Sequence, residues 1–201
     1  QGNQIIGFYP GPGMPRRKLP SEIAEIGEVR LAILGPEDPS LTLRQARDID
    51  ALGIPMVFDP GQVVASYEKA HIEELLKLCD YLIVNDHEAE VLETNSGYTR
   101  EEMISLAGEL VVTHGDRGVG VFNEDQVTHV DAVPDVEIVE VTGCGDAFRA
   151  GYCYGILAGH DQRVRAQLGC ILAMRNLMSP ETQQYTINLP EAEQLLAEIY
   201  G

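Results

Sequence analysis

The chain has no tryptophan, only three lysines and few basic residues of any kind, and these shortages narrow the choice of partners. Its 14 lysine and arginine residues stand against 32 aspartate and glutamate residues, which gives a formal net charge of −18. Such a surface repels the phosphates of nucleic acids and of anionic lipids, so we expect neither a nucleic acid nor a membrane as a partner. A phosphorylated ligand would need a local positive field from backbone N–H groups, a helix N-terminus or a metal ion.

Cysteines and long apolar runs are also scarce. The spacings of Cys79, Cys144, Cys153 and Cys170 match neither a zinc pattern nor a small disulfide framework, so we expect reduced thiols in a cytoplasmic protein. No apolar run is long enough to span a membrane, and no signal peptide is visible. With 201 residues, of which 44% are apolar, the chain is sufficient for one globular domain.

The first residue is Gln1 rather than methionine, and the chain opens directly on a strand-like segment at residues 4–9. A stretch rich in glycine and proline follows at 10–15 and predicts turns. We interpret the sequence as a fragment of a longer polypeptide.

Short apolar runs alternate with helical segments through the first half of the chain. The predicted strands are 29–34, 56–58, 81–84 and 110–113, and the predicted helices are 40–52 with Ser40 as its cap, 68–78, 87–94 and 100–107. Strands that are apolar on both faces and alternate with helices are typical of a parallel sheet covered by helices. The sequence therefore predicts an α/β fold.

The pattern changes after Gly118. Two strand-like segments, 119–122 and 126–132, flank a polar turn and predict a β-hairpin, and another short strand is predicted at 136–141. From Cys144 the chain predicts two helices that are broken near 159–161, and Pro190 then opens a last amphipathic helix.

The strongest motif is Thr142-Gly143-Cys144-Gly145-Asp146, where a predicted strand runs into a helix. Glycines let the backbone turn several N–H groups toward one point, and the helix start adds roughly +0.5 charge there. Gly143, Cys144 and Gly145 can thus form an anion hole, and Asp146 can accept a proton from a substrate hydroxyl. Taken alone, so short a motif is better explained as a tight turn with an aspartate cap.

Two other polar clusters follow predicted strands. Asn85 and Glu88 come after the third strand and could hold a hydrated Mg²⁺ ion, which prefers oxygen ligands. Thr113, Gly115 and Gly118 come after the fourth strand and suit a nucleotide phosphate or ribose. Each cluster alone also fits an ordinary helix cap or loop. Ligands of open parallel sheets bind beyond the carboxyl ends of the strands, so the shared placement of all three clusters favours a ligand site.

With these motifs in this order, the chain resembles the ribokinase-like (PfkB) family of sugar and nucleoside kinases. The resemblance runs through nearly the whole chain and is most specific at residues 142–148. It implies a three-layer sandwich, in which helices flank a mostly parallel central sheet and a β-hairpin lies near the nucleotide site. The implied reaction is ATP-dependent phosphoryl transfer to a hydroxymethyl group of a nucleoside or sugar, with ATP and Mg²⁺ as cofactors.

The resemblance also implies a role for each motif residue. The implied set comprises the catalytic base Asp146, the anion hole of Gly143, Cys144 and Gly145, the pair Asn85 and Glu88 that is linked to Mg²⁺ through water, and the nucleotide-site residues Thr113, Gly115, Gly118, Ala173 and Asn176. Ala173 and Asn176 would belong to a helix that flanks the adenine. Weaker similarity to adenosine-kinase-like members lies in Gln1-Gly2-Asn3-Gln4, in Phe8-Tyr9-Pro10-Gly11 and in Thr182-Gln183.

Two departures from the family pattern bear on function. The family usually has Asp-Thr where this chain has Glu140-Val141, and in several relatives that region supports a monovalent cation, which leaves K⁺ as an open cofactor. Family members also begin with an α/β segment that carries paired glycines for gripping the sugar, and with the strands of a small lid. This chain matches neither, so we interpret residues 1–201 as a single domain, the C-terminal part of such a kinase.

Two classes of function therefore stay open. The first is a kinase that acts on a small-molecule nucleoside or sugar, either as a homodimer or in association with the missing N-terminal segment. The second is a nucleotide-binding or interaction module that is derived from such a kinase and does not catalyse. A nucleophilic role for Cys144 at the helix start is a weaker alternative, because no histidine lies nearby in the sequence.

Overall fold

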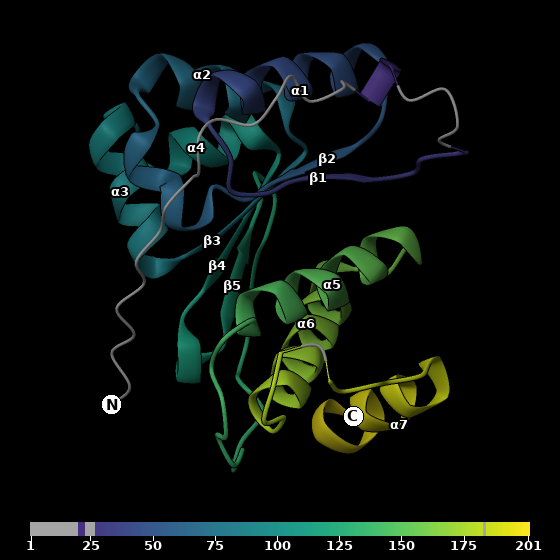
Figure 1. The fold of residues 1–201 in the computed structure, drawn as a ribbon. Coiled ribbons are helices and arrows are strands. Elements are labelled where there is room, and N and C mark those ends of the chain that lie inside the picture. Colours follow the sequence, from purple (N-terminus) through teal and green to yellow (C-terminus); the bar gives the residue numbers. More distant parts are fainter. Residues whose placement is uncertain (1–19, 23–26, 183) are drawn as a thin grey trace.

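The structure is a computed structural model that describes residues 20–22, 27–182 and 184–201 (Figure 1). The strand predicted at 4–9, the turns at 10–15, and the adenosine-kinase-like residues at 1–4, 8–11 and 183 lie outside the described residues.

One mixed sheet of six strands forms the centre of the fold, in the order β1-β2-β3-β4-β5-β6. The strands are β1 (Ala32–Leu34), β2 (Met56–Phe58), β3 (Tyr81–Asn85), β4 (Glu109–Thr113), β5 (Val119–Phe122) and β6 (Val127–Val130). The first four are parallel to one another, whereas β5 and β6 join the sheet in antiparallel orientation. The predicted parallel sheet and the hairpin are both confirmed.

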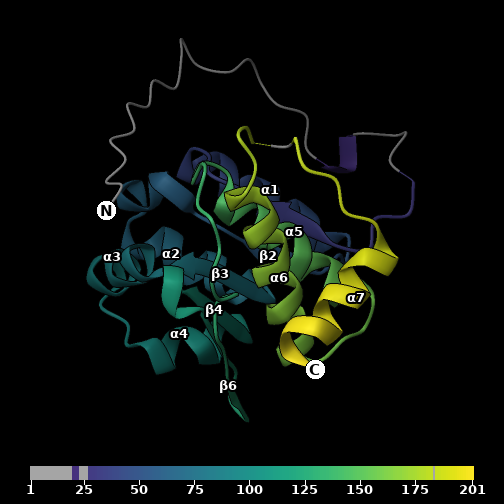
Figure 2. The same ribbon diagram turned by 90° about the horizontal axis from the view of Figure 1, so that it is seen from below.

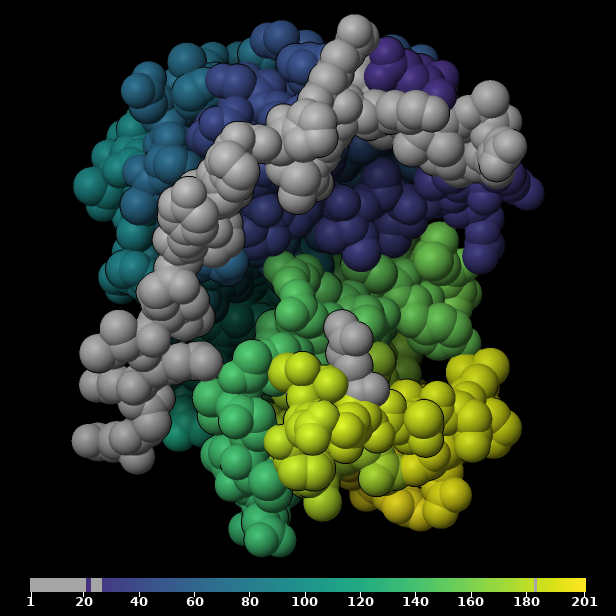
Figure 3. All heavy atoms as spheres, viewed as in Figure 1, coloured from purple at the N-terminus to yellow at the C-terminus, as the bar shows by residue number. Residues whose placement is uncertain are grey.

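Helices cover both faces of this sheet (Figures 1 and 2). On one face lie α1 (Pro39–Ala51), α2 (Lys69–Leu78), α3 (Asp86–Ser96) and α4 (Arg100–Ala107), and on the other lie α5 (Cys144–Leu157) and α6 (Gln162–Leu177), with α7 (Leu189–Tyr200) packed on α6. Three short 3₁₀ segments complete the described elements: η1 (Pro20–Glu22), η2 (Gly61–Ser66) and η3 (Gly115–Arg117). In the space-filling view, the N-terminal part of the chain (purple to teal) and the C-terminal part (green to yellow) occupy opposite sides (Figure 3).

Alternate strand residues supply two separate hydrophobic cores. Leu82, Val84 and Leu110 face α1 to α4, whereas Ile83 and Val111 face α5 and α6. Successive side chains of a strand point to opposite faces, so a strand that is buried on both sides needs an unbroken apolar run. This is why the short runs of the sequence indicated a sheet covered by helices, and the three-layer arrangement that the resemblance implied is confirmed.

Two local predictions were wrong. Residues 136–141 form no strand; instead the backbone N–H groups of Val139 and Glu140 donate to the Leu177 carbonyl at 2.8 and 3.2 Å. The side chains of Ile138, Val139 and Val141 are exposed, so the apolar, β-branched composition of this segment suggested a strand although the segment pairs with no sheet edge. The cap of α1 is Asp38 and not Ser40, because the Asp38 carboxylate accepts from the Ser40 and Leu41 N–H groups at 3.0 and 3.1 Å.

All four cysteines are free. None of the helices in the described part of the chain is both long enough and apolar enough to cross a membrane.

Gly118 connects the turn after β4 to the hairpin at a position that excludes a side chain. Its φ angle is +90°, and a Cβ atom there would lie 2.1 Å from the Val130 carbonyl oxygen of β6. Its own carbonyl accepts from the His114 N–H at 2.8 Å, which closes the turn. The glycine therefore allows the hairpin to approach the loop that follows β4.

We expect Gly118→Ala to lower the free energy of unfolding by about 1–3 kcal/mol, since the added methyl group meets backbone that cannot easily move. Gly53→Ala is the matched control, because Gly53 also has a positive φ of +66° but has nothing within 4 Å of its Cβ position. Urea unfolding of both variants tests this. An equal loss in the two variants would contradict the close approach at Gly118.

Candidate functional site

The register of β3 and β4 brings two of the predicted clusters together. Asn85 is the last residue of β3 and Thr113 is the last residue of β4, and the two are paired across the parallel ladder. The Thr113 hydroxyl also donates to the Val84 carbonyl of the neighbouring strand at 3.5 Å. The two polar clusters therefore begin side by side at the carboxyl edge of the sheet.

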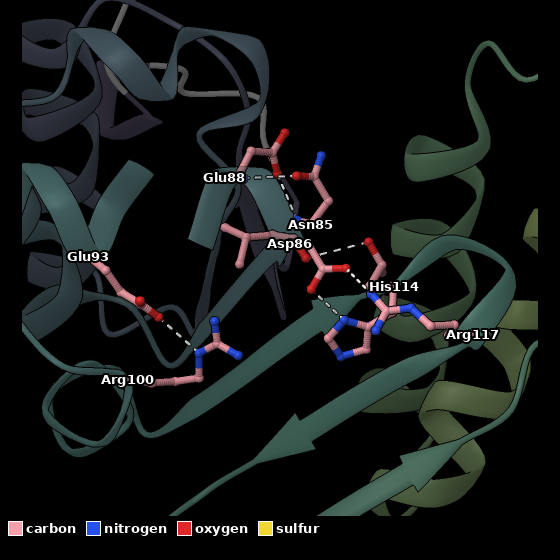
Figure 4. Close-up of polar contacts among 9 residues, drawn as sticks. Asn85, Asp86, Glu88, Glu93, Arg100, His114 and Arg117 are labelled. Carbon is pink, nitrogen blue, oxygen red and sulfur yellow. Dashed lines mark hydrogen bonds and ion pairs between the residues drawn. The ribbon is translucent and has the colours of Figure 1, made fainter. Parts of the chain in front are cut away.

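Asn85 and Glu88 form a capping box at the start of α3 (Figure 4). The Glu88 N–H donates to Asn85 Oδ1, and the Asn85 N–H donates to Glu88 Oε2, both at 2.9 Å. Burial raises the pKa of Glu88 above its ordinary value, although the Asn85 N–H opposes the shift. The helix cap that the sequence left open as an alternative is thus present, and it holds both oxygen-bearing side chains on one turn.

This turn fits a Mg²⁺ ion only if the ion keeps most of its water. Within the described residues, no group of three or more His, Cys, Asp or Glu side chains could hold a metal. One carboxylate and one amide suit Mg²⁺ that is otherwise coordinated by water and by substrate phosphates, as its reluctance to lose water favours. A nearby cation would also stabilise the charged form of Glu88, which burial disfavours.

Asp86 connects the two clusters, a contact that sequence reasoning missed. Its Oδ1 lies 2.6 Å from His114 Nδ1, and its Oδ2 accepts from Arg117 Nη2 at 2.7 Å (Figure 4). The start of α3 is thereby fastened to η3, the turn in which Gly115 adopts a φ of +62°. The pattern Asn85-Asp86 directly after a strand was a signal that could have indicated this role.

The glycine motif forms the N-terminus of α5. Gly143 is the N-cap residue with a φ of +82°, and it carries no side chain that could cap the helix. Cys144 and Gly145 begin the first turn, so their backbone lies where the helix dipole is positive. The Cys144 thiol is not activated by this position, because burial raises its pKa rather than lowering it.

Glu140 shapes the approach to this turn. Its Oε1 accepts from the N–H groups of Val141 and Thr142, at 2.9 and 3.0 Å, and from the Thr142 hydroxyl at 2.8 Å. These contacts, with the Thr142 N–H first, lower the pKa of Glu140. Glu140, which stands where the family usually has aspartate, therefore forms hydrogen bonds with the loop to which it belongs.

Asn176 on α6 contacts the glycine motif through a hydrogen bond. The side chain is buried, its Nδ2 donates to the Thr142 carbonyl at 2.8 Å, and its Oδ1 lies 3.2 Å from where a Gly143 Cβ would be. Ala173 lies one turn earlier on α6 and packs against the core beneath α5. The structure thus places Asn176 beside the turn at Gly143, and Asn176 also belongs to the helix predicted to flank the adenine.

Asp146 lies in the first turn of α5, and 75% of its side chain is exposed. Its Oδ1 contacts Arg149 Nη2, and Arg149 Nη1 in turn contacts Asp59 Oδ2. Sequence reasoning missed Arg149 and Asp59. The signal for Asp59 was its place directly after β2, since this is the same sheet edge that Asn85 and Thr113 occupy.

Known proteins resemble this chain in sequence and in fold. A family model described as pfkB family carbohydrate kinase matches residues 1–188. The nucleoside kinase of Methanothermobacter thermautotrophicus is 29% identical over 190 residues, which are 94% of this chain and 60% of that protein. The nucleoside kinase of Burkholderia thailandensis in complex with inosine is 28% identical with a TM-score of 0.84, over 88% of this chain and 59% of that one. Its complex with ADP-inosine also gives a TM-score of 0.84 at 28% identity, over 88% and 56%.

We expect Glu88→Gln to weaken Mg²⁺-dependent nucleotide binding by about tenfold or more, as loss of a metal-orienting group does. Stability should be unchanged or higher, because glutamine can keep the capping box while the charge penalised by burial is removed. Glu102→Gln is the control, since Glu102 forms the same box with Thr99 in α4. Titration calorimetry with and without Mg²⁺ measures the effect. Equal affinities for Glu88→Gln and the control would contradict it.

Asn176→Ala should cost about 1–3 kcal/mol of stability and weaken nucleotide binding several-fold, since the Thr142 carbonyl loses its donor and the glycine turn loosens. Asn95→Ala removes a comparable bond, Asn95 Nδ2 to the Tyr67 carbonyl at 3.0 Å, in the other helical layer. The control should lose stability while nucleotide affinity is kept. Thermal unfolding and fluorescent-nucleotide titration of both variants provide the comparison.

Proposed function

The chain belongs to the pfkB family of carbohydrate kinases, and on that premise we propose that it transfers a phosphoryl group from ATP to a hydroxymethyl group of a nucleoside. The observation that carries the proposal is the joint placement of Asp146 and the glycine turn at the N-terminus of α5. An exposed carboxylate beside a concentration of backbone N–H groups provides both a base and an anion hole.

In the proposed reaction, Asp146 accepts the proton of the acceptor hydroxyl. The hydroxyl oxygen of the acceptor attacks the γ-phosphorus of ATP at the same time. The bond between that phosphorus and the bridging oxygen breaks, and ADP leaves. Phosphoryl transfer needs little covalent help from a protein, so catalysis consists mainly of positioning and charge stabilisation. The backbone N–H groups of the turn at Gly143, Cys144 and Gly145 would stabilise the charge on the transferred group.

The nucleotide would extend along the carboxyl edge toward β3 and β4. Thr113, Gly115 and Gly118 would line its phosphates and ribose, and the C-terminal part of α6, with Ala173 and Asn176, would flank the adenine. Mg²⁺, held through water by Asn85 and Glu88, would neutralise phosphate charge during transfer. In a chain of net charge −18, these local groups must provide the field that attracts an anionic nucleotide.

A nucleoside is the proposed acceptor because two relatives that match most of this chain are nucleoside kinases, and one of those two proteins is bound to inosine. The chain spans about 60% of the length of those relatives, so the activity of the whole protein is part of the proposal. In the alternative, these residues bind nucleotide without turnover.

We expect Asp146→Asn to lower turnover by about 10²–10⁴, the usual worth of a positioned base, while ATP affinity is largely kept. Glu101→Gln is the control, because Glu101 is an acidic residue in the first turn of α4. ADP release is measured with inosine, adenosine and ribose as acceptors. Unchanged turnover in Asp146→Asn would refute the base assignment, and ATP binding without turnover in the unmodified chain would favour the non-catalytic alternative.

A further inference from the structure

Asp59 is a buried carboxylate that is only half satisfied. It follows β2 directly, and its N–H donates to the Leu34 carbonyl of β1 at 2.9 Å. Its side chain is 8% exposed, with Oδ2 paired to Arg149. Within the described part of the chain, Oδ1 is buried without a hydrogen-bond partner. A buried charge with an unpaired oxygen opposes folding, so stability does not explain why a carboxylate occupies this position.

Arg149 joins this buried carboxylate to the proposed catalytic base. Its side chain is 16% exposed and lies one turn after Asp146 on α5. One terminal nitrogen of the guanidinium, Nη1, contacts Asp59, and the other, Nη2, contacts Asp146. Burial lowers the pKa of Arg149, yet an arginine keeps its charge at neutral pH. The planar group therefore bridges two carboxylates that lie 87 positions apart in the sequence.

The two ends of this bridge differ in exposure. Asp59 is held by buried backbone at the sheet edge, whereas three quarters of the Asp146 side chain is exposed. A simple surface ion pair would restrain Asp146 weakly, because both side chains would have to be ordered for it. Here Asp59 already orders the guanidinium, so Arg149 presents a fixed donor to Asp146. Catalytic groups need such support, since displacements near 1 Å can cost about 10²-fold in rate.

We infer that Asp59 and Arg149 are positioning residues that hold the Asp146 carboxylate where it meets the acceptor hydroxyl. This inference rests on the proposed function and adds two residues to it. Asp59 fixes Arg149, and Arg149 fixes Asp146, so the geometry of the base depends on a carboxylate 87 positions earlier in the chain. Neither positioning residue needs to touch the substrate.

The molecule contains a second buried arginine–carboxylate pair that serves as a matched control. Arg165 Nη1 lies 3.5 Å from Glu109 Oε1, and their side chains are 19% and 9% exposed, close to the values of Arg149 and Asp59. Glu109 is the first residue of β4, at the opposite end of that strand from Thr113. Arg165→Met and Glu109→Gln therefore disrupt a similar pair away from the site.

The kinetic test compares Asp59→Asn, Arg149→Met and Arg149→Lys with these controls in the 201-residue chain. We expect Asp59→Asn and Arg149→Met to lower kcat for inosine by about 10–10²-fold at a nearly unchanged KM for ATP. Arg149→Lys should recover part of this loss, because an ammonium keeps the charge but cannot bridge both carboxylates in one plane. The control variants should keep kcat per folded molecule. A loss of kcat in the controls equal to that in Arg149→Met would overturn the inference.

A second measurement does not require turnover. Thermal midpoints are determined for Asp59→Asn, Asp146→Asn and the double variant, with Arg149 intact and again with Arg149→Met. We expect the two changes to be non-additive when Arg149 is present and additive when it is replaced. Additivity in both backgrounds would show that the bridge does not couple the carboxylates. If the unmodified chain has no turnover, the proposed function fails while this cycle still decides whether Asp59 and Arg149 hold Asp146.

Discussion

The parallel pairing of β1 to β4 is the constraint on which the candidate site depends. Parallel strands end at a common edge, so Asp59 after β2, Asn85 at the end of β3 and Thr113 at the end of β4 are brought to one side of the molecule. The pairing is maintained because each strand buries apolar side chains on both faces, and a shift of one residue would exchange the two cores. The two hydrophobic cores therefore fix the register of the strand ends from which the candidate site is built.

Electrostatics of the site follow from the scarcity of basic residues. In a chain of net charge −18, Arg117 is paired with Asp86 and Arg149 is shared by two carboxylates, so neither is a free cation for a phosphate. The positive field at the glycine motif comes instead from the backbone and the dipole of α5. The direction of this field is fixed by the backbone, whereas a field from lysine side chains would require those flexible side chains to be ordered first.

Several residues at this edge serve local structure and the candidate site together. Asn85 and Glu88 cap α3 while presenting oxygen atoms on one turn, and Glu140 binds the loop that leads into the glycine motif. Asn176 fastens that loop to α6. A helix cap and a ligand site have the same chemical requirements, namely oriented oxygens and N–H groups at a helix end. The two interpretations that the sequence left open at Asn85 and Glu88 are therefore compatible with each other.

Local rules of the sequence were enough to determine the layered α/β fold, the hairpin, and the placement of polar clusters at strand ends. The strand at 56–58 and the helix at 100–107 were predicted to the residue, because apolar periodicity and capping act over a few neighbouring positions. The same composition misled at 136–141, where β-branched residues have no sheet edge available. Whether an apolar run becomes a strand depends on a partner that the run itself does not specify.

Contacts between distant residues were decided only by the tertiary structure. Nothing near Asp146 in the sequence indicates Asp59, and nothing near Thr142 indicates Asn176. These contacts arise because the sheet places the end of β2 opposite the start of α5, and because α5 packs along α6. The sequence by itself determined which residues could carry the chemistry. The packing of two helical layers on one sheet decided which side chains hold them in place, since packing brings together residues that chain order keeps apart.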